Sequence, residues 1–141
     1  MDRKPLILQF LVLLFFILGC TSTDLSTPEK NYESFYAAIK AKNFDMFSKC
    51  FHTDAEAYNE KNLRILANKV FNDFDITSHR IIKKENIREN ETSIVAGEIW
   101  QRKNGIRAKS TFRINYINSG GIWKIISTET LSLKKLSDKS M

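Results

Sequence analysis

The sequence predicts an α+β fold class, with N-terminal helices packed on a curved antiparallel sheet after a signal peptide. Three observations favour it: an apolar run that ends at a cysteine, a helical spacing of apolar residues over the next fifty positions, and an alternation of apolar and polar residues from Asp75 onward. They divide the 141 residues into a signal peptide (1–19), a flexible tether (20–27), one α+β domain (28–131) and a polar tail (132–141).

The first nineteen residues have the composition of a secretory signal. Arg3 and Lys4 provide a positive start, and Gln9 alone interrupts the apolar run from Leu6 to Leu18. A membrane-crossing helix needs about 20 apolar residues, whereas the core of a signal peptide needs about 7 to 15. We therefore expect cleavage after Gly19, the alternative being an uncleaved anchor helix in which the following cysteine is incidental.

The residues around this cleavage point resemble the lipobox of bacterial lipoproteins, an aliphatic residue, a small or aliphatic residue, Gly or Ala, and Cys. Ile17, Leu18, Gly19 and Cys20 match in order, although Leu18 is larger than the usual Ala or Ser. The resemblance implies that Cys20 carries diacylglycerol on sulfur and holds the mature chain on a bacterial cell membrane. Two or three acyl chains anchor a protein firmly. Thr21 replaces the Asp that signals inner-membrane retention in enteric lipoproteins, which favours the outer membrane.

A polar, Ser/Thr-rich segment separates Cys20 from the first helix, and we expect it to be flexible. Thr27 and Pro28 are typical of a helix start. Apolar residues then recur at helical spacing, with a break near Asn43 and a third helix from about Asn59 to Asn72. Cys50, the second cysteine, falls on an apolar helix face, where we expect a buried and inert thiol.

Four β-type runs follow, at residues 76–84, 92–100, 106–117 and 122–127. Asn104-Gly105 predicts a two-residue hairpin turn with positive φ at both positions. In the third run the apolar residues share one face and the basic residues share the other, so we expect a sheet with one packed and one solvated face.

This order is similar to that of the nuclear-transport-factor-two-like (SnoaL-like) domains, from "TPEKNYESFYAAIKAKNFDMFSKCF" through "GGIWKI". The features that carry the resemblance are a Pro-started helix ending in "AIKAKNFD", a second short helix, and a last strand that begins with Trp. The resemblance implies a cone-shaped, cystatin-like fold with an apolar pocket, used by isomerases, dehydratases, carriers and scaffolds. The aromatic residues that we expect to line it are Phe35, Tyr36, Trp100, Phe112 and Trp123.

No residue cluster supplies evident catalytic chemistry. Asp45, Asp54 and Asp73 lie at expected helix ends or turns, and Tyr36 and Tyr116 lie on apolar faces where packed rings are expected. The only histidines are His52 and His79, and neither has partners at metal-ligand spacing. We therefore expect no catalytic residue, no metal, no cofactor and no enzyme, with no buried carboxylate beside the pocket.

The predicted function is that of a lipid-anchored, non-catalytic binding or accessory domain of the cell envelope. Its expected partners are the membrane, through Cys20, and either an envelope protein or an apolar small molecule. Export of the chain from the cytoplasm disfavours nucleic acid as a partner. A small isomerase- or dehydratase-type enzyme, a carrier of an apolar ligand and an envelope-assembly component are the alternatives. The formal charge of +6 is concentrated in part on a basic hairpin, from Arg102 to Arg113, that is suited to solubility, anionic lipid or an acidic partner.

Overall fold

Side-chain caps begin all three α-helices among residues 23–54 and 56–137, the part of the chain that this computed structural model describes. The Thr27 hydroxyl accepts a hydrogen bond from the Lys30 amide at 3.1 Å. Asparagine amide oxygens do the same at the two later starts. The helices are α2 (Pro28–Ala41), α3 (Phe44–Lys49) and α4 (Glu60–Asp73), with a 3₁₀ turn η1 (Glu56–Tyr58) before α4.

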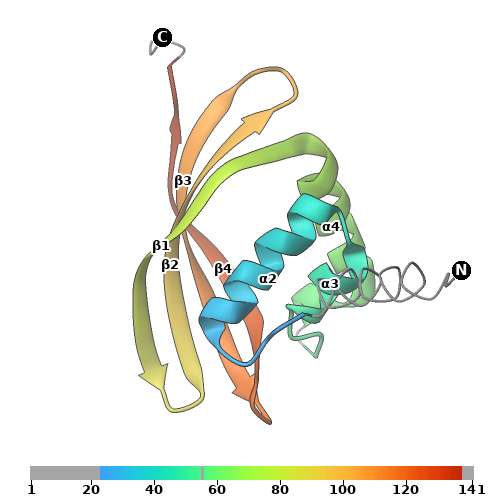
Figure 1. Ribbon diagram of the computed structural model, residues 1–141, viewed down its shortest axis with the longest axis vertical. Coiled ribbons are helices and arrows are strands. Elements are labelled where there is room, and N and C mark those ends of the chain that lie inside the picture. The colour runs from blue at the N-terminus through green and yellow to red at the C-terminus, as the bar shows by residue number, and fades with distance from the viewer. Residues whose placement is uncertain (1–22, 55, 138–141) are drawn as a thin grey trace, which may run out of the picture.

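The second half of the chain forms a four-stranded antiparallel sheet in the order β1-β2-β3-β4. Register shifts between β1 and β2 and between β3 and β4 bend the strands, and the three helices cover the concave face (Figure 1). The predicted fold class is therefore confirmed. The strands are β1 (Phe74–Arg88), β2 (Glu91–Arg102), β3 (Arg107–Ser119) and β4 (Ile122–Lys135).

The core lies between the helices and the concave face of the sheet. It contains rings from α2, α3 and the segment after α3, aliphatic side chains from the middle strands, and the buried thiol of Cys50. An isolated parallel bridge from Phe51 to Ile125 fastens the end of α3 to β4. The fully buried large side chains are Tyr32, Phe47, Phe51, Leu63, Ile94, Ile114, Tyr116 and Ile125.

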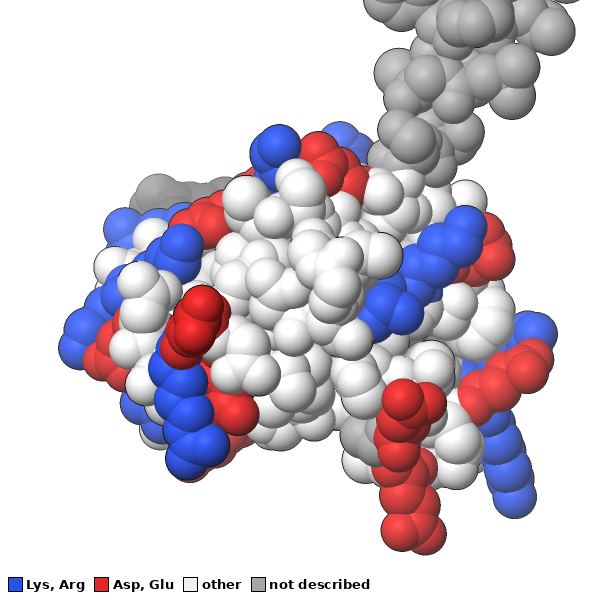
Figure 2. All heavy atoms as spheres, turned by 90° about the horizontal axis from the view of Figure 1, so that it is seen from below, with Lys and Arg blue, Asp and Glu red and all other residues white. Residues whose placement is uncertain are grey.

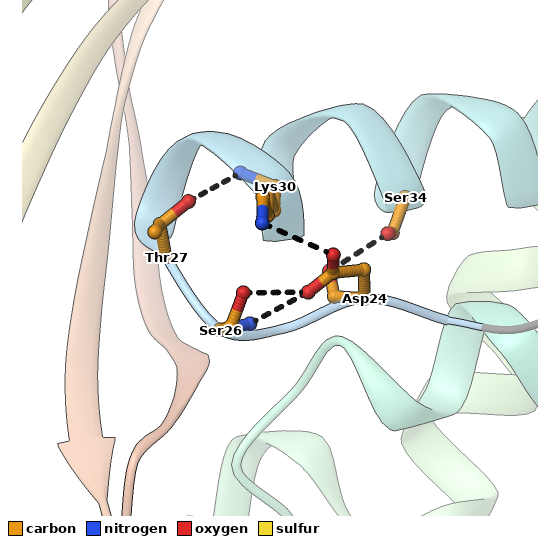
Figure 3. A network of polar contacts seen from close by, with 5 residues as sticks. All are labelled: Asp24, Ser26, Thr27, Lys30 and Ser34. Carbon is orange, nitrogen blue, oxygen red and sulfur yellow. Dashed lines mark hydrogen bonds and ion pairs between the residues drawn. The ribbon is translucent and has the colours of Figure 1, made fainter.

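The last residues of the expected tether are held against the domain. The Asp24 carboxylate accepts hydrogen bonds from the backbone and hydroxyl of Ser26 and pairs with Lys30 at 3.3 Å (Figure 3). The Asp24 carbonyl accepts from the Ser34 hydroxyl at 3.0 Å, and the Leu25 carbonyl accepts from the Trp123 amide at 2.9 Å. The flexible segment that we expected to reach Thr27 therefore does not include residues 24–27, because polar groups of α2 and β4 bind their backbone.

Two further local expectations differ from the structure. Strand β4 continues to Lys135 and pairs with β3, so residues 132–135 of the expected polar tail belong to the sheet. In the β2–β3 hairpin only Gly105 has positive φ, +86°, and the Arg102 amide bonds the Ile106 carbonyl across a three-residue loop. A type I turn closed by a left-handed glycine accounts for this geometry. No helix in the described ranges is long and apolar enough to cross a membrane.

Candidate ligand-binding site

Strand β2 places one carboxylate on the concave face. Side chains alternate along a strand, so Glu98 points to the same side as Ile94, Ala96 and Trp100. Ile94 and Ala96 are fully buried in the core. Glu98 is therefore an acidic residue in an otherwise apolar series, directed toward the helices.

Two hydroxyl groups hold the Glu98 carboxylate, one from a helix and one from a neighbouring strand. The Tyr36 phenol of α2 donates to Oε2 at 2.9 Å. The Ser110 hydroxyl donates to Oε1 at 3.2 Å, across the β2–β3 register in which Ser110 lies opposite Glu98. Each carboxylate oxygen thus has one donor, and both oxygens retain further capacity to accept.

His79 completes the cluster from β1, where it lies opposite Glu98 in the sheet register. Its imidazole stacks on the Tyr36 ring with centroids 4.0 Å apart and planes 3° from parallel. Tyr32 packs edge-on to both rings. The Nδ1 atom of His79 is buried and has no hydrogen-bond partner among the described residues, so the imidazole is positioned by stacking rather than by a polar contact.

Burial dominates the electrostatics of this cluster. It raises the pKa of Glu98 above the ordinary value, against the hydrogen bonds from Tyr36 and Ser110 and the nearby His79, which lower it. Burial likewise raises the pKa of the Tyr36 phenol, and the Glu98 charge adds to that rise. Tyr36 is therefore a hydrogen-bond donor at any physiological pH, and Glu98 is a carboxyl group whose proton affinity is increased.

Glu98 faces a cavity of about 220 Å³ between the helices and the sheet, here called the Glu98 cavity. An apolar cavity of about 150 Å³ accommodates benzene, so this volume suits a bicyclic ring or a short aliphatic chain. Most of its lining is aromatic or aliphatic, and its polar residues besides Glu98 are Thr128, Glu129 and Thr130 of β4, of which Glu129 pairs with Arg113 at 3.2 Å. The lining residues are Phe35, Ile39, Phe47, Phe51, Leu66, Val70, Ile76, Glu98, Phe112, Thr128, Glu129 and Thr130.

A second cavity of about 310 Å³, here called the His79 cavity, adjoins the first, because Ile39, Val70 and Ile76 line both. Tyr36 and His79 line it, and Lys42 and Asp75 are among its polar residues. Lys42 ends α2 in the left-handed conformation, at φ 51°. Tyr36, which lines the His79 cavity, thus forms a hydrogen bond with Glu98, which lines the Glu98 cavity.

The structure does not bring the five expected pocket aromatics together. Phe35 and Phe112 line the Glu98 cavity, whereas Tyr36 lines the His79 cavity. Trp123 lines a separate cavity of about 420 Å³ near the start of α2. Trp100 packs edge-on to Phe74 at 5.0 Å, near the β2–β3 hairpin. Helices α2 and α4 cover only part of the sheet, and the two tryptophans lie at opposite ends of it.

The carboxylate beside the cavity was missed at the sequence level, where no buried acid was expected. Glu98 lies in the second predicted β-type run, "TSIVAGEIW", at a position that alternation assigns to the packed face. That acidic interruption was the available signal. Nothing local connects it with Tyr36 or His79, since only the packing of α2 over β1 and β2 brings the three together.

The remaining candidates are structural or untested. Cys50 is buried, burial raises the pKa of its thiol to about 12, and its sulfur lies 3.4 Å from the Met46 carbonyl oxygen as a weak donor. Asp45 pairs with Lys49 on the surface of α3. Within the described ranges no group of His, Cys, Asp or Glu side chains is arranged to hold a metal ion. Cys20 lies outside the described residues.

No protein-family model matches the chain, and no curated protein matches its sequence. Solved structures do match. A SEC-C motif containing protein from Rhodopseudomonas palustris superposes with a TM-score of 0.67 at 16% identity, over 82% of this chain and 86% of that one. A ketosteroid isomerase-like protein from Erwinia carotovora atroseptica gives 0.56 at 13% identity, over 77% and 96%.

An NTF-2 like protein of unknown function from Shewanella oneidensis also gives a TM-score of 0.56, at 9% identity over 72% of this chain and 93% of that one. At such identities the similarity establishes the fold alone. The described domain therefore has the NTF2-like fold, as the sequence resemblance implied, and its function has to be argued from its own residues.

Proposed function

We propose that this protein is a bacterial lipoprotein, held on the membrane through Cys20, whose NTF2-like domain binds a small apolar molecule without transforming it. The observation that carries the proposal is the Glu98 carboxylate, held by Tyr36 and Ser110 in a largely apolar cavity of about 220 Å³ whose other acidic residue, Glu129, pairs with Arg113. Binding sites for small molecules combine an apolar lining with a few fixed polar groups. Glu98 would accept a hydrogen bond from a hydroxyl group of the ligand.

Ligand binding is tested with 1-naphthol and naphthalene, which share a bicyclic ring and differ in one hydroxyl group. When Glu98 is ionised, a hydrogen bond to its carboxylate contributes about 1.5–3 kcal/mol, so at a pH that ionises Glu98 the wild type should bind 1-naphthol at least about tenfold more tightly than naphthalene. In Glu98→Gln that preference should largely disappear. Glu91→Gln, on the same strand at its other end, is the control and should retain it.

The measurement is titration calorimetry of the full-length protein in nanodiscs, with empty discs subtracted for partitioning into lipid. Equal affinity of the wild type for both compounds would exclude a polar anchor in the cavity. If neither compound binds, the cavity is not a site for small aromatic ligands, and a domain that acts by protein contact is favoured.

The membrane anchor is tested separately through Cys20. Cys20→Ala should accumulate as an uncleaved precursor, because the lipoprotein peptidase family acts on the lipidated cysteine. The wild type should enter the detergent phase of a phase-partition experiment. The mass of the mature protein should include the acyl groups on Cys20. A mature wild-type protein with a free Cys20 thiol in the aqueous phase would contradict the assignment.

An enzyme is the second candidate, because a carboxyl group whose pKa is raised inside a cavity is the kind of group that acts as a general acid or base. The corresponding reaction is proton transfer at a carbon next to a carbonyl group. Exchange of the α-hydrogens of 2-tetralone for deuterium, followed by NMR, tests this directly. Protein-dependent exchange that is lost in Glu98→Gln and kept in Glu91→Gln would favour the enzyme over the binding protein.

A further inference from the structure

The contacts of residues 24–27 restrict where a lipid anchor at Cys20 can hold the domain. Asp24 is fixed by Ser26, Lys30 and Ser34, and Leu25 is fixed by the backbone of Trp123. Only residues 21–23 separate Cys20 from Asp24. Four extended residues span at most about 14 Å. The surface around Leu25 and Trp123 must therefore lie close to the lipid headgroups.

The same end of the domain carries apolar side chains that the core does not cover. Ile122 precedes Trp123 and is 46% exposed, and Ile87, near the end of β1, is 55% exposed. Ile87 and Trp123 line one cavity together with Pro28. The Asn118 amide bonds the Asn90 carbonyl, which joins the β3–β4 end to the β1–β2 turn. Both turns therefore belong to one continuous surface beside the tether.

Figure 2 views the molecule from this end. Uncharged residues fill the middle of the face, and acidic and basic side chains stand around it. The basic residues near the cavity, Lys84 and Arg88, already have acidic partners in Glu29 and Glu91. Such a face has little net charge to attract an anionic surface, but it offers exposed apolar area and a tryptophan of the kind enriched at membrane interfaces.

We infer that this end of the domain, around Ile87, Ile122 and Trp123, docks on the bilayer surface and orients the protein on the membrane. The inference rests on the proposed anchor at Cys20. It places the basic β2–β3 hairpin at the far end of the sheet, away from the lipid. Ala108, opposite Trp100, and Asn118, opposite Trp123, lie ten positions apart on β3, which corresponds to about 33 Å along a strand.

The two tryptophans of the chain, Trp100 and Trp123, permit a matched test. Trp100→Phe leaves Trp123 as the only emitter, and Trp123→Phe leaves Trp100. Each full-length, processed variant is reconstituted in phosphatidylethanolamine and phosphatidylglycerol vesicles that contain a lipid with a nitroxide on its headgroup. We expect the nitroxide lipid to quench Trp123 emission strongly. Trp100 emission should be the same in vesicles with and without the nitroxide lipid.

A second pair of variants tests the surface itself, in the Trp100→Phe background. Ile122→Glu introduces a charge at the proposed contact and should reduce the quenching of Trp123. Ile65→Glu makes the same change at a residue that is 59% exposed on α4, and should leave the quenching unchanged. Both positions are on the surface, so neither change removes core packing.

Flotation of the same vesicles separates the two proposals. A wild type that does not float with lipid overturns the anchor, and the docking with it. A protein that floats, with Trp123 quenched no more than Trp100, keeps the anchor and overturns the docking. Stronger quenching of Trp100 than of Trp123 would overturn the docking as well, because the hairpin end would then be the membrane contact.

Discussion

Two groups of neighbours shift the pKa of Glu98 in opposite directions. Its hydroxyl donors favour the ionised form, and the surrounding apolar side chains disfavour it more strongly, so its pKa is raised. The carboxyl group thus retains its proton at a higher pH in the folded protein than in the unfolded chain. This difference links the candidate site to the stability of the whole domain.

Glu98→Gln should therefore change the pH dependence of folding. Between the ordinary pKa of 4.5 and the raised folded value, the folded state binds more protons than the unfolded state, so its free energy of unfolding falls as pH rises. A glutamine cannot titrate, so the stability of the wild type relative to Glu98→Gln should decline from pH 4 upward. Urea unfolding of both proteins at a series of pH values measures this.

Asp24, Glu29 and Glu85 have lowered pKa values and contribute stability that is lost as the pH falls. They are present in both proteins, so the difference between wild type and Glu98→Gln isolates Glu98. A difference that is constant from pH 4 to pH 8 would mean that the pKa of Glu98 is the same in the folded and unfolded states.

Tyr36→Phe should destabilise the protein by about 1 kcal/mol, because it removes a hydrogen bond to the Glu98 carboxyl group. The loss should be smaller when Glu98 is already glutamine. Denaturant unfolding of the two single variants and the double variant gives the coupling energy between the residues. A coupling near zero would show that the phenol and the carboxylate do not interact in solution.

At the scale of elements, the β2–β3 hairpin requires a positive φ at Gly105. Gly105 has φ +86°, and no atom lies within 4 Å of the position that a Cβ would take. Gly105→Val should cost about 1 kcal/mol or more through backbone strain alone, whereas Gly105→Asn should cost less because Asn tolerates positive φ. Thermal unfolding compares the three proteins, and equal melting temperatures would place the strained residue elsewhere in the turn.

The helices and strands were predictable because local patterns specify them. Thr27 and Pro28 gave the start of α2, and alternation gave the sheet, including the packed face of β3. The full lengths of β1 and β4 were not predictable, since their exposed ends are ordered by pairing with neighbouring strands and not by burial. The candidate site was not predictable either, because Tyr36, His79 and Glu98 come from three elements whose relative placement no local pattern encodes.

At the scale of the whole molecule, Asn31 joins the two halves of the fold. Its side-chain amide is fully buried and donates to the Cys50 carbonyl at 3.0 Å and to the Trp123 carbonyl at 2.8 Å. One residue of α2 thus holds both the end of α3 and the start of β4. Its amide oxygen has no partner among the described residues.

Asn31→Ala should reduce the free energy of unfolding by about 2 kcal/mol, because it removes two buried hydrogen bonds. Asn62→Ala is the matched control. It removes an exposed side-chain hydrogen bond from Asn62 to the Glu56 carbonyl, and it should change stability by less than about 0.5 kcal/mol. Denaturant unfolding measures both. Equal decreases in the free energy of unfolding would show that the buried hydrogen bonds of Asn31 stabilise the protein no more than an exposed one does.

The contact between Asn31 and the start of β4 also sets an order of events during synthesis. A ribosome releases the N-terminal part of a chain first, at about 5–20 residues per second. Helix α2 emerges early, yet its polar contact with Trp123 has a partner 92 residues later in the sequence. Closing so long a loop is slow compared with forming a helix or a hairpin. The Asn31 side-chain amide therefore stays exposed to solvent until β4 has been synthesised and can pack against α2.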